Sequence, residues 1–398
     1  MKPVIDAKAP AFHEDYKQAS FRNRRHTLQV SVCQGAGGNM SHANRSTMLE
    51  QLNAERRLLL LPVIAVYCVV MVTGIVGNIM AIYVYGRRYQ MKAAILFMII
   101  LAATDLLSCS VCLPFEIYDN VNSYMNQMPI PCKIFRFIEA FTNTFSGLIL
   151  VCIASDRFRN TRYPLKMSSL EQSKSLAIVM CALAVSIAWP MVVLSGDRTV
   201  RTRIDGVTGV DCSTSDMMYH SVYSLLFQGC LSLLFGICFV TFVVFYGLIA
   251  LTVCKRSYGT IGARISQKVP TMPVSPMKRK KFEQMLIARA LSSMKTPIDK
   301  TCSSVGKIHL RPGHTTMMLS VITFSGIIGY VPYLTVELLH FSGQRFQEDM
   351  GSSELIIYKM CNNSYFLNNA MNPIIYSILS PHFRRECFVC LKRIFRCK

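Results

Sequence analysis

The stretch Asn372-Pro373-Ile374-Ile375-Tyr376 closes the last long apolar segment of the chain, and a basic stretch over 381–398 follows it. A proline in a helix interior costs about 3 kcal/mol in water. In a membrane helix it is tolerated, because neighbouring helices and polar side chains satisfy the freed backbone groups. The Asn before it and the Tyr after it suit the interior of a bundle. The stretch therefore predicts a bent membrane helix, followed by an amphipathic cytoplasmic helix and tail over 381–398.

Seven apolar stretches are each long enough to cross a bilayer, which takes about 20 helical residues. The 398 residues are 52% hydrophobic and only 16% charged, whereas soluble domains carry about 25% charged residues. We expect the spans at Leu58–Tyr85, Ala93–Tyr118, Cys132–Arg157, Lys174–Ser195, Tyr219–Cys254, His314–Phe341 and Leu355–Leu379. So many uncharged runs could not all be buried without lipid, which argues against a water-soluble helical protein. The predicted fold class is an all-α membrane protein, a seven-transmembrane helix bundle over 58–380.

Positive charge is concentrated in the loops on one side of the predicted bundle. The loop 255–311 holds 13 Lys and Arg residues and only the acids Glu283 and Asp299, and the chain has a formal net charge of +21. The positive-inside rule places this third intracellular loop and the C-terminus in the cytoplasm, and seven spans then place the N-terminus outside. The charge faces the anionic inner leaflet, so we expect contact with membrane lipid and no binding of nucleic acid.

The segment 1–57 is mostly polar and carries the sequons Asn39-Met40-Ser41 and Asn44-Arg45-Ser46. We expect this segment to be extracellular, disordered and glycosylated at Asn39 and Asn44. Together with the seven spans, it predicts a multi-pass protein of the plasma membrane.

The cysteine positions agree with two redox environments. Cys132 begins the third span on the outer side, and Cys212 lies in the outer loop before the fifth. These two can form a disulfide in an oxidising compartment. Cys387 and Cys390 follow the last span among basic residues, as palmitoylation sites do. Free cytosolic thiols are the alternative for that pair.

Short motifs occur in order along the predicted spans. They are Gly77-Asn78, Leu101-Ala102-Ala103-Thr104-Asp105, Cys132 with Asp156-Arg157-Phe158 at a Cys-to-Arg spacing of 25 residues, Tyr246, Pro332-Tyr333 and Asn372-Pro373-x-x-Tyr376. In these motifs the chain from Leu58 to Cys397 resembles the rhodopsin-like (class A) G-protein-coupled receptors. The end of span three, Ile153 to Leu165, also looks like that of invertebrate neuropeptide and orphan receptors. The resemblance implies a receptor for an extracellular ligand, with heterotrimeric G proteins and arrestin as cytoplasmic partners.

A carboxylate in the middle of a span marks a candidate ion site. A charge at that depth is expensive, so Asp105 in span two indicates a functional role by default. By resemblance, Asp105, Ser146 and Asn368 form a sodium-binding pocket, and their carboxylate, hydroxyl and amide oxygens suit a hard cation. The alternative is a hydrogen-bonded polar core without an ion. No other cofactor is expected.

The inner end of span three carries the candidate activation switch. We expect the Arg157 guanidinium to pair with Asp156 at rest. By resemblance, it is released to meet the G protein and Tyr246 when span six, bent at Pro332, moves outward. Asn372, Pro373 and Tyr376 in span seven belong to the same switch.

Several positions depart from the pattern of the family. Phe158 follows Asp-Arg where Tyr is usual, and Ala184 stands near the place of a usual Trp. Cys238 replaces a proline in span five, and span six has Tyr330 for a Trp and Gly326 for a Phe. These departures bear on switching and not on the fold. The stretch 307–311 has no acid to hold Arg157, which predicts raised basal signalling.

Three acids in the outer halves of the spans are candidate ligand contacts: Glu116, Glu139 and Glu337, with Tyr330 and Tyr333 beside them. Carboxylates inside a bundle need partners. A cationic ligand would supply one, and internal pairing of Glu139 with Arg136 or Lys359 is the alternative. The long outer loop Asp197–Tyr219 and the extended N-terminus favour a basic or amidated neuropeptide.

Three other functional classes are alternatives to a peptide receptor. A biogenic-amine receptor would use Glu139, and a transporter or channel could line a cation path with Asp105, Glu116 and Glu139. A receptor relative that no longer signals is the third alternative, raised by Cys238, Gly326 and Tyr330. The sequence has no Gly-rich phosphate loop, HExxH motif or metal-spaced CxxC pair, so we predict that the protein is not an enzyme.

Overall fold

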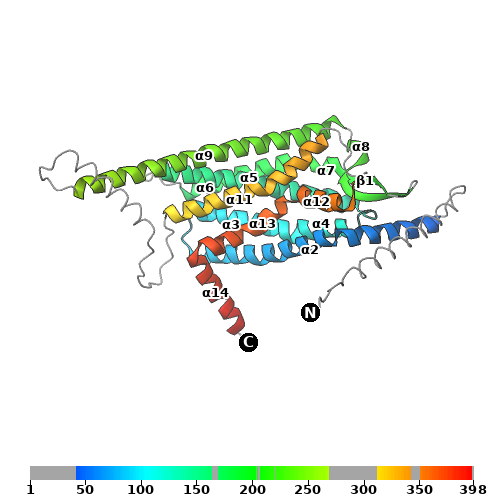
Figure 1. Ribbon diagram of the computed structural model, residues 1–398, viewed down its shortest axis with the longest axis horizontal. Helices are drawn as coiled ribbons and strands as arrows, with labels where there is room; N and C mark the ends of the chain where they lie inside the picture. The colour runs from blue at the N-terminus through cyan, green and yellow to red at the C-terminus, as the bar shows by residue number, and fades with distance from the viewer. Residues whose placement is uncertain are drawn as a thin grey trace, which may run out of the picture.

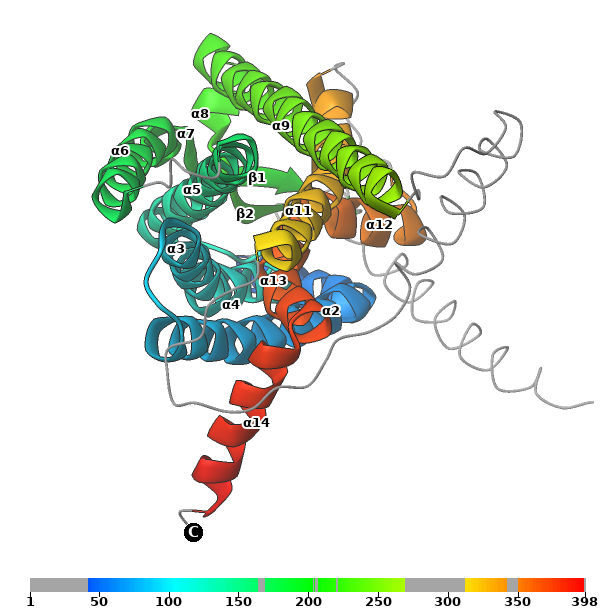
Figure 2. The same cartoon turned by 90° about the vertical axis from the view of Figure 1, so that its left-hand side faces the viewer.

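The computed structural model describes residues 42–163, 169–202, 204, 207–219, 221–268, 312–341 and 350–396. Long helices run side by side along one axis (Figure 1), and a view along that axis shows them grouped into a single bundle (Figure 2). In chain order the elements are α2 (His42–Arg88), α3 (Ala93–Leu107), the π-helix η1 (Ser108–Cys112), α4 (Leu113–Val121), α5 (Pro129–Arg162), α6 (Leu170–Ala188), α7 (Met191–Leu194), β1 (Ser195–Arg201), β2 (Thr208–Thr214), α8 (Asp216–Tyr219), α9 (Val222–Lys268), α11 (Pro312–Phe341), α12 (Ser352–Asn362), α13 (Tyr365–Leu379) and α14 (Pro381–Arg396).

Six helical segments of the described chain are long and apolar enough to cross a membrane. They are Asn44–Arg88, Ala93–Val121, Pro129–Arg162, Leu170–Leu194, Val222–Lys255 and Met317–Glu337. The seventh predicted span is present as two shorter helices, α12 and α13. The most apolar windows of the fourth and fifth segments are only 17% and 11% buried, so their hydrophobic side chains face outward, as they would towards lipid. The predicted seven-span all-α bundle is confirmed.

Three of the predicted spans are less regular than expected. Span two passes through the π-helix η1, and α4 carries it on to Val121. Span four is interrupted at Pro190, where α6 gives way to the short α7, because proline has no backbone N–H for the helical ladder. Span seven breaks between α12 and α13 at 363–364. Hydrophobicity sets the length of a span, but local hydrogen bonding sets these interruptions.

The expectation that the whole segment 1–57 is disordered is wrong for its last part. The helix α2 begins at His42 and extends beyond the outer end of the bundle. Leu52 on this extension packs with Tyr124 and Val207. Asn53 accepts a hydrogen bond from the backbone N–H of Tyr124 and donates one to the carbonyl of Val121. These contacts with the first outer loop keep the extension helical.

The long inner loop is also shorter than expected. The helix α9 continues to Lys268, so 255–268 is helical and not loop. The rest of that loop, including 307–311 and its missing acid, lies outside the described residues.

A β-hairpin lies at the same end of the bundle as the start of α2 (Figure 1). Its strands β1 and β2 pair antiparallel in a register that runs from Ser195↔Thr214 to Arg201↔Thr208. The predicted disulfide is present: Cys132 at the start of α5 is bonded to Cys212 in β2. The bridge holds the hairpin against the outer end of α5.

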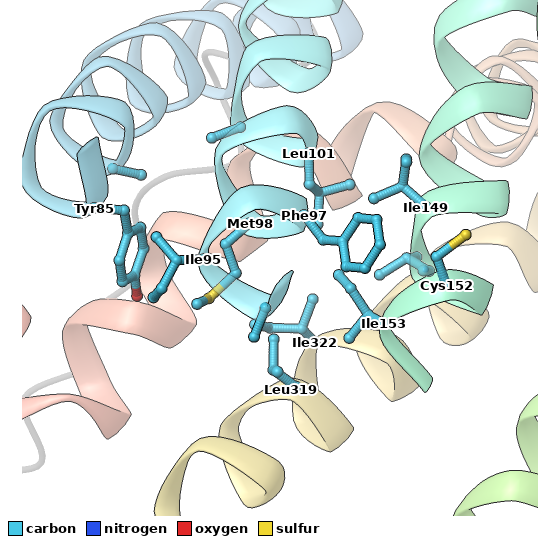
Figure 3. Close-up of a cluster of buried hydrophobic side chains, with 14 of the residues drawn as sticks. Tyr85, Ile95, Phe97, Met98, Leu101, Ile149, Cys152, Ile153, Leu319 and Ile322 are labelled. Atoms are coloured by element: carbon cyan, nitrogen blue, oxygen red, sulfur yellow. The ribbon is translucent and has the colours of Figure 1, made fainter. Parts of the chain in front are cut away.

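A large hydrophobic cluster occupies the inner half of the bundle, and a second one lies towards its outer end. Side chains from α2, α3, α5 and α11 meet in the first cluster, among them Tyr85, Met98, Ile149, Ile153 and Leu319 (Figure 3). The helix α14 is attached through aromatic rings, with Phe383 5.7 Å from Tyr85 and 5.7 Å from Tyr376 between ring centroids. The last span, the first span and the cytoplasmic helix are therefore packed as one unit.

Two glycines allow α2 to approach its neighbours closely. A Cβ atom on Gly77 would lie 2.6 Å from the Cβ of Pro373, and one on Gly74 would lie 2.3 Å from the Sγ of Cys109. Small residues at helix interfaces of membrane proteins serve this purpose, because van der Waals packing between helices supplies much of their association.

We predict that Gly77→Ala forces α2 and α13 apart at Pro373 and destabilises the protein by about 1–3 kcal/mol, the usual cost of overpacking. The measurement is the thermal unfolding temperature of the full-length protein in detergent. Gly86→Ala is the matched control, since Gly86 is on the same helix and a Cβ there would meet nothing within 4 Å. Equal unfolding temperatures for the two variants would contradict the close contact.

Candidate functional site

A cavity of about 680 Å³ opens at the outer end of the bundle, between α5, α9, α11, α12 and the β2 strand. Five carboxyl groups and three cations line it: Glu116, Asp119, Glu139, Asp211 and Glu337, with Arg136, Arg198 and Lys359. The excess of two acids over cations makes the cavity negative when all these groups are ionised. Cavities of 300–1,000 Å³ are typical ligand sites.

Asp211 lies in β2, outside the spans. Burial, reinforced by the nearby carboxylate of Asp119, raises the pKa of Asp211 to about 6. The charge of this wall therefore becomes less negative as the pH falls towards 6.

Arg136 is the central cation of the cavity wall. Its Nη1 lies 2.8 Å from Glu139 and 3.2 Å from Glu116, and its Nη2 lies 3.9 Å from Asp119. Nη2 also donates to the carbonyl of Cys212 at 3.0 Å. A guanidinium carries five donors in a fixed plane, which lets one side chain serve several acceptors at once.

The two outer acids of spans two and three are thus already paired. Glu139 also accepts a hydrogen bond from the hydroxyl of Tyr365, and Glu116 accepts one from the amide of Asn363 at 2.5 Å. Of the two alternatives for Glu139, internal pairing with Arg136 is the arrangement in the structure. The sequence pointed to Arg136 as a partner, but it gave no sign of Tyr365 or Asn363.

Glu337, unlike Glu116 and Glu139, is not paired with a residue that the structure describes. It is half-buried on α11 and lines the same cavity. Within the described part of the chain, no cation or hydrogen-bond donor contacts its carboxylate. Tyr330 and Tyr333 line the cavity one to two turns further in, and the hydroxyl of Tyr330 donates to the carbonyl of Asn143 at 3.4 Å.

The hydroxyl of Ser364 stabilises α11 next to Pro332, and nothing in the sequence indicated this role. In a regular helix the N–H of Tyr333 would donate to the carbonyl of Gly329. Here the hydroxyl of Ser364 lies between them, accepting from Tyr333 N at 3.2 Å and donating to Gly329 O at 2.7 Å. Ser364 lies in the break between α12 and α13, so the two irregular spans share one hydrogen-bonded joint. An inserted side chain is a recognised cause of helix kinks.

Asp105 is fully buried in the middle of the bundle. It accepts a hydrogen bond from Asn372 at 2.7 Å, and Ser146 lies close to it. Its Oδ1 atom and the Oδ1 atom of Asn368 are buried without a donor in the described part of the chain. The structure brings Asp105 and Ser146 together, while Asn368 lies against Gly326 and Gly329 on α11.

The inner switch residues adopt the paired arrangement expected at rest. The Nη2 of Arg157 lies 2.5 Å from Asp156, whose carboxylate also accepts from Asn160. Tyr246 on α9 forms no hydrogen bond with Arg157 in the described part of the chain. Its hydroxyl hydrogen-bonds to the hydroxyl of Thr323 at 2.9 Å, which ties α9 to α11. Tyr376 is buried against Tyr85, with ring centroids 5.2 Å apart.

Comparison with known proteins identifies this arrangement. The sequence profile of the family described as "7 transmembrane receptor (rhodopsin family)" matches residues 77–376, three quarters of the chain. The chain belongs to the rhodopsin family of receptors. This membership agrees with the resemblance in the motifs and favours a receptor over an enzyme or a transporter.

Two relatives are similar over most of the receptor. The QRFP-like peptide receptor of Branchiostoma floridae is 21% identical over 333 residues, which cover 82% of this chain and 76% of that protein. The neuropeptide FF receptor 2 of Rattus norvegicus is 22% identical over 337 residues, covering 81% of this chain and 70% of that protein.

The candidate modification sites lie at the two ends of the receptor. Asn44 is exposed near the start of α2, while Asn39 lies outside the described residues. Cys387 and Cys390 are half-buried on α14. Cys387 packs against the core, and this burial raises the pKa of its thiol to about 11. Glycosylation and palmitoylation remain predictions.

We predict that Arg136→Met destabilises the receptor by about 3–5 kcal/mol, because it leaves three carboxylates in the cavity wall without their cation. Thermal unfolding in detergent and the amount at the cell surface should both fall. Adding Glu116→Gln and Glu139→Gln to this variant should recover part of the loss. Lys133→Met is the control, a cation at the same end of α5 that forms no ion pair with the residues that the structure describes. Unchanged stability of Arg136→Met would show that the carboxylates do not need Arg136.

Proposed function

We propose that the receptor lies in the plasma membrane and binds a cationic peptide in its outer cavity, with the start of α2 outside and α14 in the cytoplasm. Binding then activates heterotrimeric G proteins through outward movement of α11. The observation that carries the proposal is the carboxylate of Glu337. It lines a cavity of net negative charge and contacts no cation or hydrogen-bond donor among the described residues. Buried carboxylates are stabilised by an opposite charge, and a basic side chain of a ligand supplies it.

A peptide fits better than a small amine for two reasons. An amine receptor would need the carboxylate of Glu139, which Arg136 and Tyr365 already occupy. The cavity also reaches from Glu337 on α11 to Asp211 in the hairpin, a width that suits several residues. The two relatives, both named as peptide receptors, support the same class.

The contacts at the inner end suggest how α11 is released. The Tyr246–Thr323 hydrogen bond joins α9 and α11, and Arg157 is held by Asp156. Movement of α11 about its Pro332 joint would break the first contact and free Tyr246 to meet Arg157. A ligand that contacts α11 through Glu337 can bias this two-state element, because it binds the two positions of α11 with different affinity. Arrestin and anionic inner-leaflet lipid would meet the same cytoplasmic end, with α14 anchored by palmitate at Cys387 or Cys390.

We predict that Glu337→Gln lowers the potency of a cationic peptide agonist at least tenfold, since a charge pair in such a site contributes about 2–5 kcal/mol. The agonist would first be found by exposing cells with a panel of G-protein activation sensors to basic and amidated peptides, with biogenic amines alongside. Glu50→Gln is the control, an exposed acid on the outer extension of α2. Peptide potency unaffected by Glu337→Gln would remove Glu337 from the site.

The outcome of the screen also separates the alternatives. A response to an amine instead of a peptide would overturn the ligand class but keep the receptor. No response to any compound, from a protein present at the cell surface, would favour a relative that does not signal.

We also propose an allosteric sodium ion beside Asp105. The orphaned Oδ1 atoms of Asp105 and Asn368 and the hydroxyl of Ser146 are all oxygen ligands, which suit a hard cation. A bound sodium ion would supply positive charge to a carboxylate that otherwise lies buried and unpaired.

We predict that sodium chloride, compared with choline chloride at equal ionic strength, lowers agonist affinity in the wild-type receptor and not in Asp105→Asn. The reason is that the substitution removes the charge that would hold the ion. Radioligand competition with the agonist from the screen measures the effect. Equal sodium sensitivity of the two proteins would leave Asp105 in a hydrogen-bonded polar core without an ion.

A further inference from the structure

The ligand cavity continues inward past Tyr330. Gly326, one turn or about 6 Å further in on α11, also lines the cavity, as do Gly147 on α5 and Cys238 on α9. Three helices therefore present small residues to the inner end of the cavity. Gly147 lies eight residues, about 12 Å, beyond Glu139 along α5. The inner end is well separated from the acidic outer wall.

The two glycines have different surroundings. A Cβ atom on Gly326 would lie 3.4 Å from both Asn368 and Leu150, so α11 packs closely against α13 and α5 at this point. A Cβ atom on Gly147 would meet no heavy atom within 4 Å. The open space at the inner end is therefore on the side of Gly147. A side chain at Gly147 would therefore begin in open space on the wall of the cavity.

The inner end is apolar. Leu150 and Phe242 line it and are buried from solvent, with exposed fractions of 4% and 6%, and Ile327 completes the wall. The charged residues that line the cavity all lie at its outer end. The ring of Tyr330 stands between the two regions, 5.8 Å from the ring of Phe235 on α9.

We propose that this inner end is a binding subsite for one apolar side chain of the ligand, an aromatic ring or a branched aliphatic group. Gly147, Leu150, Cys238, Phe242, Gly326 and Ile327 bound the subsite. The inference rests on the proposed function, because it assumes that the cationic group of the same ligand binds at Glu337. Burial of apolar surface favours such an occupant, whereas a polar group there would lose its hydration without gaining a charged partner.

Glu337 and Gly326 line one continuous cavity, so the distance between them sets the length of a ligand that reaches both. Glu337 and Gly326 are eleven residues apart on α11, which is about 16 Å along the helix. An extended peptide covers that distance in about five residues, and in fewer where long side chains reach into both ends. A small amine is too short to occupy both ends. The ligand is thus expected to carry a basic and an apolar residue about three to five positions apart.

The test fills the hollow with a leucine. Gly147→Leu is compared with Gly236→Leu, because Gly236 on α9 also has nothing within 4 Å of an added Cβ but is exposed and does not line the cavity. In the first measurement, indole serves as an aromatic probe for thermal unfolding of the full-length receptor in detergent. Indole should raise the unfolding temperature of the wild type and of Gly236→Leu, and leave that of Gly147→Leu unchanged.

The second measurement uses the peptides found by the screen. Gly147→Leu should lower their potency at least tenfold, and replacing the apolar residue of the peptide by alanine should have no further effect in that variant. If Gly147→Leu does not reach the cell surface, Cys238→Phe fills the same hollow from α9 and is expected to behave alike.

The results distinguish this subsite from the proposed function. If Gly147→Leu changes neither the indole effect nor peptide potency while Glu337→Gln lowers potency, the subsite is wrong and the proposed function stands. If no peptide activates the receptor, the proposed function fails, and loss of the indole effect in Gly147→Leu still supports an aromatic-binding inner end. A membrane acyl chain that co-purifies with the wild type but not with Gly147→Leu would make lipid the occupant and overturn the proposal.

Discussion

The outer half of the receptor is organised around the guanidinium of Arg136. It lies between carboxylates of spans two and three and reaches a backbone carbonyl of the disulfide-bonded hairpin. In a low-dielectric bundle each of those carboxylates would be costly without a cation, so one arginine holds several elements in a common position. The hydrogen bonds from Asn363 and Tyr365 add the seventh span to the same network. The walls of the cavity follow from this pairing.

Further in, close packing at small residues fixes where the helices meet. Glycines on α2 allow Pro373 and Cys109 to approach the helix, and Gly326 brings α11 against α13. Glycine has no side chain, so helices can approach closely at these positions. At Gly147 no neighbouring helix fills the space, and the cavity remains open there. The same bundle thus contains the tightly packed core of Figure 3 and an open cavity. Tyr330 lies between the acidic and the apolar ends of that cavity.

Spans six and seven are joined by hydrogen bonds between the outer and the inner half of the bundle. Ser364 bridges the opened turn of α11 beneath Pro332, and it lies in the break that separates α12 from α13. A displacement of α11 at the cavity must therefore be accommodated at this joint. Further in, Tyr246 and Thr323 join α11 to α9 by a hydrogen bond. Ligand contact and cytoplasmic contact are linked through one helix.

Apolar length, charge asymmetry and motif order were enough to establish the seven spans, the family and the Cys132–Cys212 bridge, because the bilayer and the redox environment act on composition along the chain. Folding decided which of the three outer acids has no partner among the residues that the structure describes. Glu116, Glu139 and Glu337 look alike in the sequence, but only the first two come within reach of Arg136. Pairing depends on distances between side chains on different helices, such as Glu116 and Asn363, which are 247 positions apart. For the same reason the sequence did not predict the Ser364 joint or the open space at Gly147. Both depend on how different helices pack together, and no pattern along one helix indicates them.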